Sequence, residues 1–183
     1  MTAAESQMLR EIREIPDAVA RLLDGGAPVI AEAAAEIRAL GPAFVATVAR
    51  GSSDHAATYL KYACEIVLGL PVASIGPSVA SIYRAPLRLS GGLCIVVSQS
   101  GRSPDIVEMA RAARAGGAMT LALTNDTASP LARAVQGVID LSAGPELSVA
   151  ATKTFVTSAV AAVMLVAEWA GDAPLRAAVR ALP

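Results

Sequence analysis

Short apolar runs alternate with longer segments of helical periodicity from residue 44 onward. Runs such as residues 93–97, which have no charged interruption, are typical of parallel strands buried on both faces. The pattern predicts strands at residues 44–49, 71–75, 93–97, 118–123 and 137–141. It predicts helices at residues 54–69, 78–84, 104–115, 152–170 and 174–182, with a further short helix after residues 129–130.

Strands that alternate with helices predict an α/β domain whose parallel sheet is covered on both faces. Because crossovers between parallel strands are right-handed, few topologies remain. We expect a three-layer αβα sandwich with a five-stranded parallel sheet in the flavodoxin-like order 2-1-3-4-5, formed by residues 41–183. Ligands of such sheets bind beyond the carboxyl ends of the strands, at the switch point between the first and third strands.

A helical segment at residues 1–40 is expected before this domain. Residues 2–24 predict a helix with a break at Pro16, and Glu11 is expected to face water. The pair Gly25-Gly26 predicts the end of this helix, and a second helix is expected over residues 28–40.

Composition narrows the class of protein. The 183 residues suffice for one domain, with 54% hydrophobic, 17% charged and only 3% aromatic residues, so small side chains must build the core. The surplus of apolar side chains predicts a partner surface, which a second domain or another subunit would cover. A net charge of −1 argues against binding to nucleic acid or to a membrane surface.

The cysteines and the N-terminus predict a cytoplasmic location. Cys64 and Cys94 fall in a predicted helix and a predicted strand, where they are expected as reduced core residues. The N-terminal residues are polar and charged, unlike a signal peptide. The apolar run at residues 155–167 is shorter than the ~20 residues of a membrane span, so we expect a buried or interface helix there.

The segment Ser98-Gln99-Ser100-Gly101-Arg102-Ser103, hereafter the serine loop, joins the third strand to a helix that begins at Pro104. Ser103 is a candidate N-cap, and proline is favoured at the first helical position. Hydroxyl and amide side chains at the positive end of a helix can hold a phosphate without a metal. Helix capping alone would account for Ser103 but not for the other three polar side chains.

Other ligands of such a loop fit less well. Flavodoxins use a similar hydroxyl-rich loop to bind flavin, but there it follows the first strand, and aromatic side chains flank the flavin. The glycine-rich motifs GxGxxG and GxxxxGK of nucleotide-binding proteins are absent. We therefore expect a phosphate or a sugar hydroxyl at the serine loop, and no cofactor or metal.

A second hydroxyl-rich turn follows the first strand. Ser52 and Ser53 stand where the next helix begins, and Ser53 as an N-cap is the structural alternative to a binding role. His55 is the only histidine, and it is either a solvated helix residue or a weak candidate for proton transfer. Arg50 and Arg102 flank the two turns and would either assist a phosphate or face solvent.

A third motif spans residues 146–153 and leads into the long helix at residues 152–170. Thr152 is the candidate N-cap, which places Lys153 in the first turn, where a cation is unfavourable. A carboxylate such as Glu146, or a bound anion, is expected to compensate, and we favour a structural salt bridge.

These three motifs, in this order, resemble the SIS (sugar isomerase) domain, and more closely the first of two SIS domains in the isomerase half of glucosamine-6-phosphate synthase and related amino-sugar-phosphate deaminases. The resemblance covers nearly the whole chain. It implies phosphate contacts from Ser98, Gln99, Ser100 and Ser103, and sugar contacts from Ser52, Ser53 and the backbone of Val149. Glu146 and Lys153 match the third motif with less definite roles, Glu146 as a catalytic candidate and Lys153 as a candidate substrate contact.

Two departures from the family limit what the resemblance implies. Thr2 stands where the synthase carries its N-terminal cysteine nucleophile, so ammonia supply from glutamine is not expected. The acid and base residues of the family lie largely in the second SIS domain, which would begin after Pro183. Glu146 and His55 are therefore the only catalytic candidates here, and both are weak.

We expect a domain that binds a phosphorylated sugar or amino sugar, within an aldose–ketose isomerase or deaminase. A partner, either a fused second SIS domain or the second subunit of a homodimer, would complete the site. One alternative is a non-catalytic sensor of sugar phosphates, and another is a structural half whose site only a dimer mate completes.

Overall fold

The computed structural model describes residues 6–183 and contains one five-stranded parallel sheet of order β2-β1-β3-β4-β5. This order confirms the predicted α/β topology. The strands are β1 (Phe44–Val48), β2 (Val72–Ser74), β3 (Gly92–Ser98), β4 (Met119–Thr124) and β5 (Gly137–Asp140). All seven residues of the central strand β3 are buried, which explains its uninterrupted apolar sequence.

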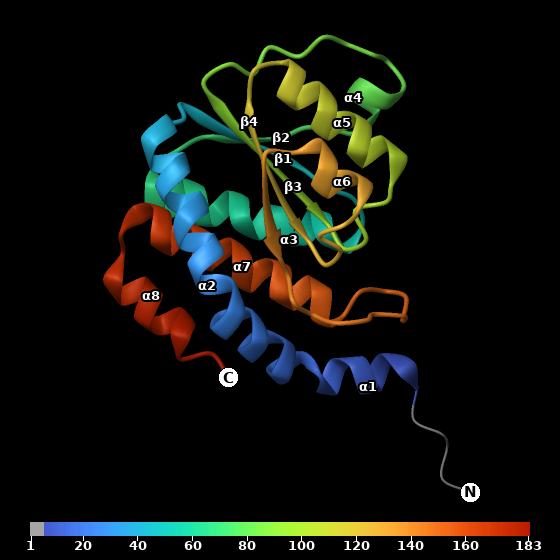
Figure 1. Ribbon diagram of the computed structural model, residues 1–183, viewed down its shortest axis with the longest axis vertical. Coiled ribbons are helices and arrows are strands. Elements are labelled where there is room, and N and C mark those ends of the chain that lie inside the picture. Colours follow the sequence, from blue (N-terminus) through green and yellow to red (C-terminus); the bar gives the residue numbers. More distant parts are fainter. Residues whose placement is uncertain (1–5) are drawn as a thin grey trace, which may run out of the picture.

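Helices cover both faces of the sheet (Figure 1). One hydrophobic cluster joins α2, α3, α7 and α8 to alternate residues of the strands, and a second joins α4, α5 and α6 to the opposite face. The helices are α1 (Gln7–Arg13), α2 (Ile15–Leu40), α3 (Ser52–Ala63), α4 (Ser78–Ser81), α5 (Pro104–Ala115), α6 (Pro130–Ala134), α7 (Lys153–Ala170) and α8 (Ala173–Arg180). Residues Cys64–Leu68 extend α3 as a π-helical segment, η1.

The N-terminal helices differ from the prediction. The break near Pro16 is confirmed, because α1 ends at Arg13 and Pro16 lies in the first turn of α2. The predicted stop at Gly25-Gly26 is wrong, since α2 continues through both glycines and Pro28. Gly26 is buried in this helix, and a Cβ there would lie 3.0 Å from Leu22 Cδ1. Residues 2–5 of the predicted helix lie outside the described residues.

Packing against α7 explains why α2 stays continuous. Buried α2 side chains such as Leu22, Ile30 and Ile37 join the same cluster as α7. Their burial outweighs the helix penalty of glycine, ~1 kcal/mol per residue. Tertiary packing has therefore overridden the local stop signal.

Helix α7 is a core helix of the domain. Among residues 6–183 it is the one helix long and apolar enough to cross a membrane, but 72% of it is buried inside the structure, as in the core of a soluble protein. This burial confirms the expected buried helix. Cys64 and Cys94 are free and buried, and burial raises the pKa of each thiol to about 12, so both stay protonated near neutral pH.

Candidate functional site

The loops that follow β1 and β3 meet at one edge of the sheet. β1 and β3 are neighbours, with Val48 paired to Val96, so their carboxyl ends lie side by side. A cavity of about 150 Å³ lies between the two loops. Its lining residues are Arg50, Ser53, Val97, Ser98, Gln99, Ser100, Ser103 and Ile106.

The serine loop is fixed to α6 by a close approach at Gly101. This glycine has a φ of +59°, and a Cβ there would lie 2.2 Å from Ser129 Oγ. Its carbonyl oxygen accepts a hydrogen bond of 3.0 Å from Leu131 N–H, and the carbonyl of Gln99 accepts one of 3.0 Å from Asn125 N–H. Only glycine fits here, because the backbone is left-handed and Ser129 occupies the space.

The hydroxyls of Ser98 and Ser100 each accept one hydrogen bond within the loop. Ser98 Oγ accepts from Gly101 N–H at 3.2 Å, and Ser100 Oγ accepts from Arg102 N–H at 3.3 Å. A hydroxyl that accepts a hydrogen bond keeps its own O–H as a donor. Both side chains can therefore hold the loop in shape and still donate to an anion in the cavity.

Ser103 occupies the predicted N-cap position of α5, but its side chain makes no capping hydrogen bond. The hydroxyl lines the cavity instead. The first amide N–H groups of α5 have no intrahelical partners, as in any α-helix, and they lie at the positive end of the helix dipole. Ser103 therefore has the backbone position of an N-cap, but its side chain does not cap the helix.

The turn after β1 differs from the prediction by two residues. Helix α3 begins at Ser52 rather than Asp54, and its N-cap is Gly51, with a φ of +57°. A left-handed glycine lets the chain turn directly into the helix, so Ser53 does not cap it. Ser53 lines the cavity.

An arginine and a carboxylate meet at the rim of this cavity. Arg50 Nη1 lies 2.5 Å from Asp105 Oδ2, which belongs to the first turn of α5. Partial burial raises the pKa of the Asp105 carboxyl, but the hydrogen bond and charge of Arg50 lower it more, so the pKa stays below its ordinary value. The Asp105 carboxyl is therefore ionised at neutral pH.

Glu146 caps helix α7. Its Oε1 accepts hydrogen bonds from the N–H groups of Thr152 at 2.9 Å and Thr154 at 3.0 Å, and also from Thr152 Oγ1 at 3.0 Å. Thr152 has the predicted N-cap position, but its side chain makes no capping hydrogen bond. The carboxylate six residues earlier satisfies the first N–H groups of α7, which is a structural role for Glu146.

Lys153 is buried and paired with a carboxylate, which confirms the favoured salt bridge. Its partner is Glu14 of the segment between α1 and α2, not Glu146. The pair brings the first turn of α7 together with residues 139 positions earlier in the chain. Local sequence spacing could not reveal this partner.

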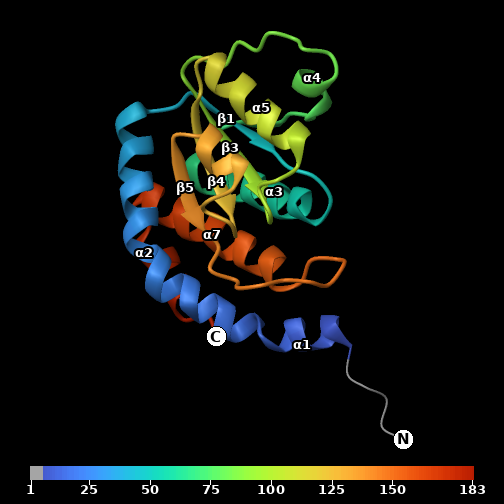
Figure 2. The same cartoon turned by 45° about the vertical axis from the view of Figure 1, so that its right-hand side comes forward.

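Glu11 is the residue that sequence reasoning missed most clearly. It was expected to face water, but it is fully buried and accepts hydrogen bonds from Leu147 N–H at 2.7 Å and Ser148 N–H at 3.1 Å. Hydrogen bonds from Gln7, Ser148 and Leu147 lower the pKa of Glu11 to about 2. Helix α1 therefore holds the loop before α7, and Figures 1 and 2 both show the two side by side.

The cavity brings together half of the residues expected at the site. Ser53 and the four expected side chains of the serine loop, those of Ser98, Gln99, Ser100 and Ser103, line it. His55 is exposed on α3, and Val149 is 94% exposed in the loop before α7. The expected residues that do not line the cavity are Ser52, His55, Glu146, Val149 and Lys153.

Comparison with known proteins shows the family of this chain. A family model described as the SIS domain matches residues 45–168. The chain belongs to the SIS domain family. This SIS domain is 40% identical over 176 residues to an isomerizing glutamine–fructose-6-phosphate aminotransferase of Symbiobacterium thermophilum, and the match covers 90% of the chain.

Two solved structures are similar to the chain over almost its whole length. A candidate phosphosugar isomerase from Silicibacter pomeroyi is 65% identical, with a TM-score of 0.93 over 96% of this SIS domain. The C-terminal domain of a glucosamine-fructose-6-phosphate aminotransferase from Francisella tularensis is 26% identical, with a TM-score of 0.84 over 98%.

The chain is shorter than each of these relatives. It spans 28% of the Symbiobacterium aminotransferase. It spans 54% of the Silicibacter protein and 53% of the Francisella domain.

Proposed function

We propose that this SIS domain binds the phosphate group of a phosphorylated sugar or amino sugar in the cavity between the ends of β1 and β3. The observation that carries the proposal is the set of Ser53, Ser98, Ser100 and Ser103 hydroxyls around one cavity of about 150 Å³. The Ser103 hydroxyl matters most, because it makes no capping hydrogen bond and borders both the cavity and the N-terminus of α5. The relatives named for fructose 6-phosphate and phosphosugars support the same ligand class.

The arrangement suits a doubly charged ester. Hydroxyl donors and the positive end of α5 would share the negative charge, which is how helix N-termini hold phosphate. The sugar would extend from the cavity toward Ser52 and the exposed residue Val149. We propose these two as sugar contacts, since neither lines the cavity itself.

We further propose that the domain belongs to an aldose–ketose isomerase or deaminase, which is cytoplasmic and acts with a partner. In that reaction a base would move a proton between C1 and C2 through an enediol intermediate. His55 and Glu146 are poor candidates, because neither lines the cavity and Glu146 caps α7. We assign the base to a second SIS domain, fused or in a homodimer, and the greater length of the relatives supports this.

The surface of α3 and η1 supports a partner. Tyr59, Tyr62 and Ile66 are exposed there, and Ile66 is 78% exposed. Apolar side chains this exposed favour contact with another domain or subunit. We propose that the segment expected at residues 1–40 shares, through α2, the core of the domain formed by residues 41–183, because α2 packs in the same cluster as α7.

A non-catalytic sensor of sugar phosphates is the second candidate. One observation favours it: among the described residues that line the cavity, none is a carboxylate, histidine or lysine that could act as a base. Such a domain would bind its ligand without turning it over.

A thermal-shift series tests the proposal. The protein is heated with fructose 6-phosphate, glucosamine 6-phosphate, the matched unphosphorylated sugars and inorganic phosphate. A ligand at ~100 times its Kd stabilises by roughly 2.7 kcal/mol, so phosphorylated ligands should raise Tm and free sugars should not. Equal Tm values with all ligands would contradict the proposal. Turnover assays of the two sugar phosphates, with ammonia added to the ketose, then separate an enzyme from a sensor.

A further inference from the structure

We propose that Arg50 is a ligand of the bound phosphate and that Asp105 is the positioning residue that holds it at the cavity. This inference rests on the proposed phosphate site and adds the charged group that the site uses. It assigns a binding role to a side chain that stands between two hollows of the surface.

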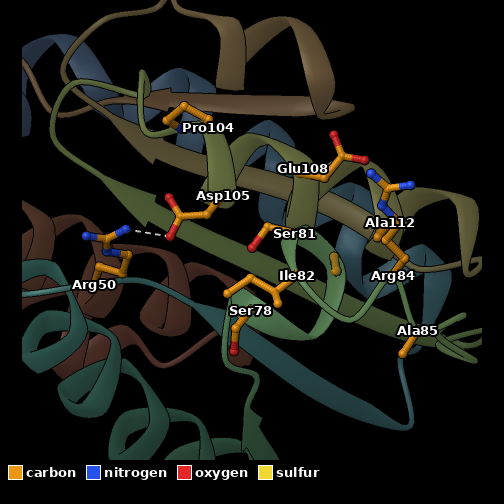
Figure 3. A pocket seen from close by; sticks show the side chains of 11 residues that line it. Arg50, Ser78, Ser81, Ile82, Arg84, Ala85, Pro104, Asp105, Glu108 and Ala112 are labelled. Carbon is orange, nitrogen blue, oxygen red and sulfur yellow. Dashed lines mark hydrogen bonds and ion pairs between the residues drawn. The ribbon is translucent and has the colours of Figure 1, made fainter.

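Arg50 lies where the phosphate cavity meets an adjoining groove. Arg50 lines the phosphate cavity and also an adjoining groove of about 900 Å³. In Figure 3 its guanidinium points toward Asp105 at the edge of this groove, and a dashed line marks their contact. The groove is bordered further along by Arg84, Ser81 and Glu108. Arg50 belongs to the turn after β1, and it lines both the cavity and the groove.

Arg50 supplies a positive charge at the cavity. Arg50 is the only charged residue among the described residues that line the phosphate cavity. A phosphate ester carries up to two negative charges, and Asp105 adds a third nearby on the first turn of α5. Without a cation between them, the carboxylate and the phosphate would repel each other. Arg50 is placed where it can compensate both.

The Arg50 guanidinium has enough N–H donors for both Asp105 and a phosphate. Arginine has five N–H donors in a planar fork, and Arg50 is bonded to Asp105 through Nη1. The remaining donors are sufficient for a phosphate oxygen pair, the kind of contact that arginine makes better than lysine. The Arg50 side chain is 63% exposed, so it can adjust to a ligand.

Arg102 provides the matched control. It belongs to the serine loop itself and also forms an ion pair, 2.8 Å from Nη2 to Asp126 Oδ2. Its side chain is 69% exposed, similar to that of Arg50, but it does not line the cavity. Removing either arginine costs the domain one positive charge, and only Arg50 is expected to affect the site.

Isothermal titration calorimetry with fructose 6-phosphate, inorganic phosphate and fructose tests the proposal on five proteins: the wild type, Arg50→Gln, Arg50→Lys, Arg102→Gln and Asp105→Asn. We expect Arg50→Gln to weaken both phosphate ligands by roughly 10- to 100-fold, the effect of one charged hydrogen bond. Arg50→Lys should lie between that variant and the wild type, because it keeps the charge and loses the fork. Arg102→Gln should bind like the wild type.

The Asp105→Asn variant shows whether Arg50 binds the phosphate itself or acts only through its ion pair with Asp105. If Arg50 mattered only through its pair with Asp105, both variants would weaken binding equally. We expect Asp105→Asn to weaken binding about two- to fivefold, less than Arg50→Gln, because Arg50 keeps its charge and loses only the exposed partner that orients it. Binding by Asp105→Asn equal to that of the wild type would overturn the positioning role of Asp105. Circular dichroism of each variant would show that the fold is kept.

The outcomes are distinguishable. If the wild type binds the phosphate ligands and Arg50→Gln binds them equally well, the role of Arg50 is overturned and the phosphate site stands. Equal losses in Arg50→Gln and Arg102→Gln, or in Arg50→Gln and Asp105→Asn, would also overturn it. If the wild type binds neither phosphate ligand, the proposed function and the role of Arg50 both fall.

Discussion

Single side chains decide the chemistry of this site, and Ser103 and Gly101 show how. Ser103 was expected to cap α5 with its hydroxyl, and the structure leaves that hydroxyl unused at the cavity. The sequence could identify the position, because Ser-Pro before an apolar helix is a clear start signal. It could not show where the hydroxyl points, because that depends on a side-chain rotation and on the neighbouring turn.

Ser103→Ala should therefore impair binding more than folding. We expect the free energy of unfolding to change by less than ~0.5 kcal/mol, as for a substitution that removes no contact. Affinity for a sugar phosphate should fall roughly tenfold, the loss of one hydrogen bond to a charged group. Urea unfolding and calorimetry measure the two quantities.

Ser129→Ala is the control for Ser103→Ala. The Ser129 hydroxyl does cap a helix, since it accepts a hydrogen bond of 3.2 Å from Ala132 N–H. Its loss should cost ~1 kcal/mol of stability. If Ser103→Ala destabilised the domain as much as Ser129→Ala, the hydroxyl of Ser103 would be a cap after all.

Gly101→Ala should strongly destabilise the serine loop. Its left-handed backbone disfavours a side chain by about 1–2 kcal/mol, and the new Cβ would also clash with Ser129. Gly41→Ala is the control, because Gly41 has a similar φ of +58° with nothing within 4 Å of the added Cβ. Urea unfolding should show a larger loss for Gly101→Ala, and equal losses would mean that the contact with Ser129 is unimportant.

Whole elements were predictable where the signal is local. The strands and α5 follow the expected boundaries to within about two residues, because buried strands need continuous apolar runs and α5 has a Ser-Pro start. Helix α2 was divided wrongly, because its apolar side chains share a core cluster with α7, a helix far later in the chain. The contacts of Glu11 were missed for the same reason, since its partners lie 136 and 137 residues away.

The contact between α1 and the loop before α7 predicts a pH dependence. The pKa of Glu11 is lowered from 4.5 to about 2 in the folded protein. A lowered carboxyl pKa stabilises the folded state above the unfolded pKa, and this contribution is lost as the pH falls from about 4.5 to about 2.

Glu11→Gln should remove that part of the pH dependence. Urea unfolding between pH 6 and pH 3 should show a wild type that loses its advantage over Glu11→Gln as the pH falls. At neutral pH the variant should be the less stable protein, because the amide cannot accept the same hydrogen bonds from the loop. A constant difference between the two proteins across this range would show that the ionised Glu11 does not hold the loop.

At the scale of the whole molecule, the sheet order places two separate hydroxyl-rich loops at one edge, and this was the part of the site that the sequence predicted best. β1 and β3 are neighbours although β2 lies between them in the chain. The order 2-1-3-4-5 alone therefore implies that residues 50–53 meet the serine loop. The contacts of Leu147, Ser148 and Lys153 could not be predicted, because their partners lie in α1 and in the segment that joins it to α2.

The most direct measurement is a crystal structure of the protein with fructose 6-phosphate. We predict the phosphate in the cavity between β1 and β3, with oxygen atoms about 2.6–3.0 Å from the hydroxyls of Ser98, Ser100 and Ser103. A phosphate bound at another surface, with no phosphate oxygen within hydrogen-bond distance of these three hydroxyls, would contradict the assignment of the site.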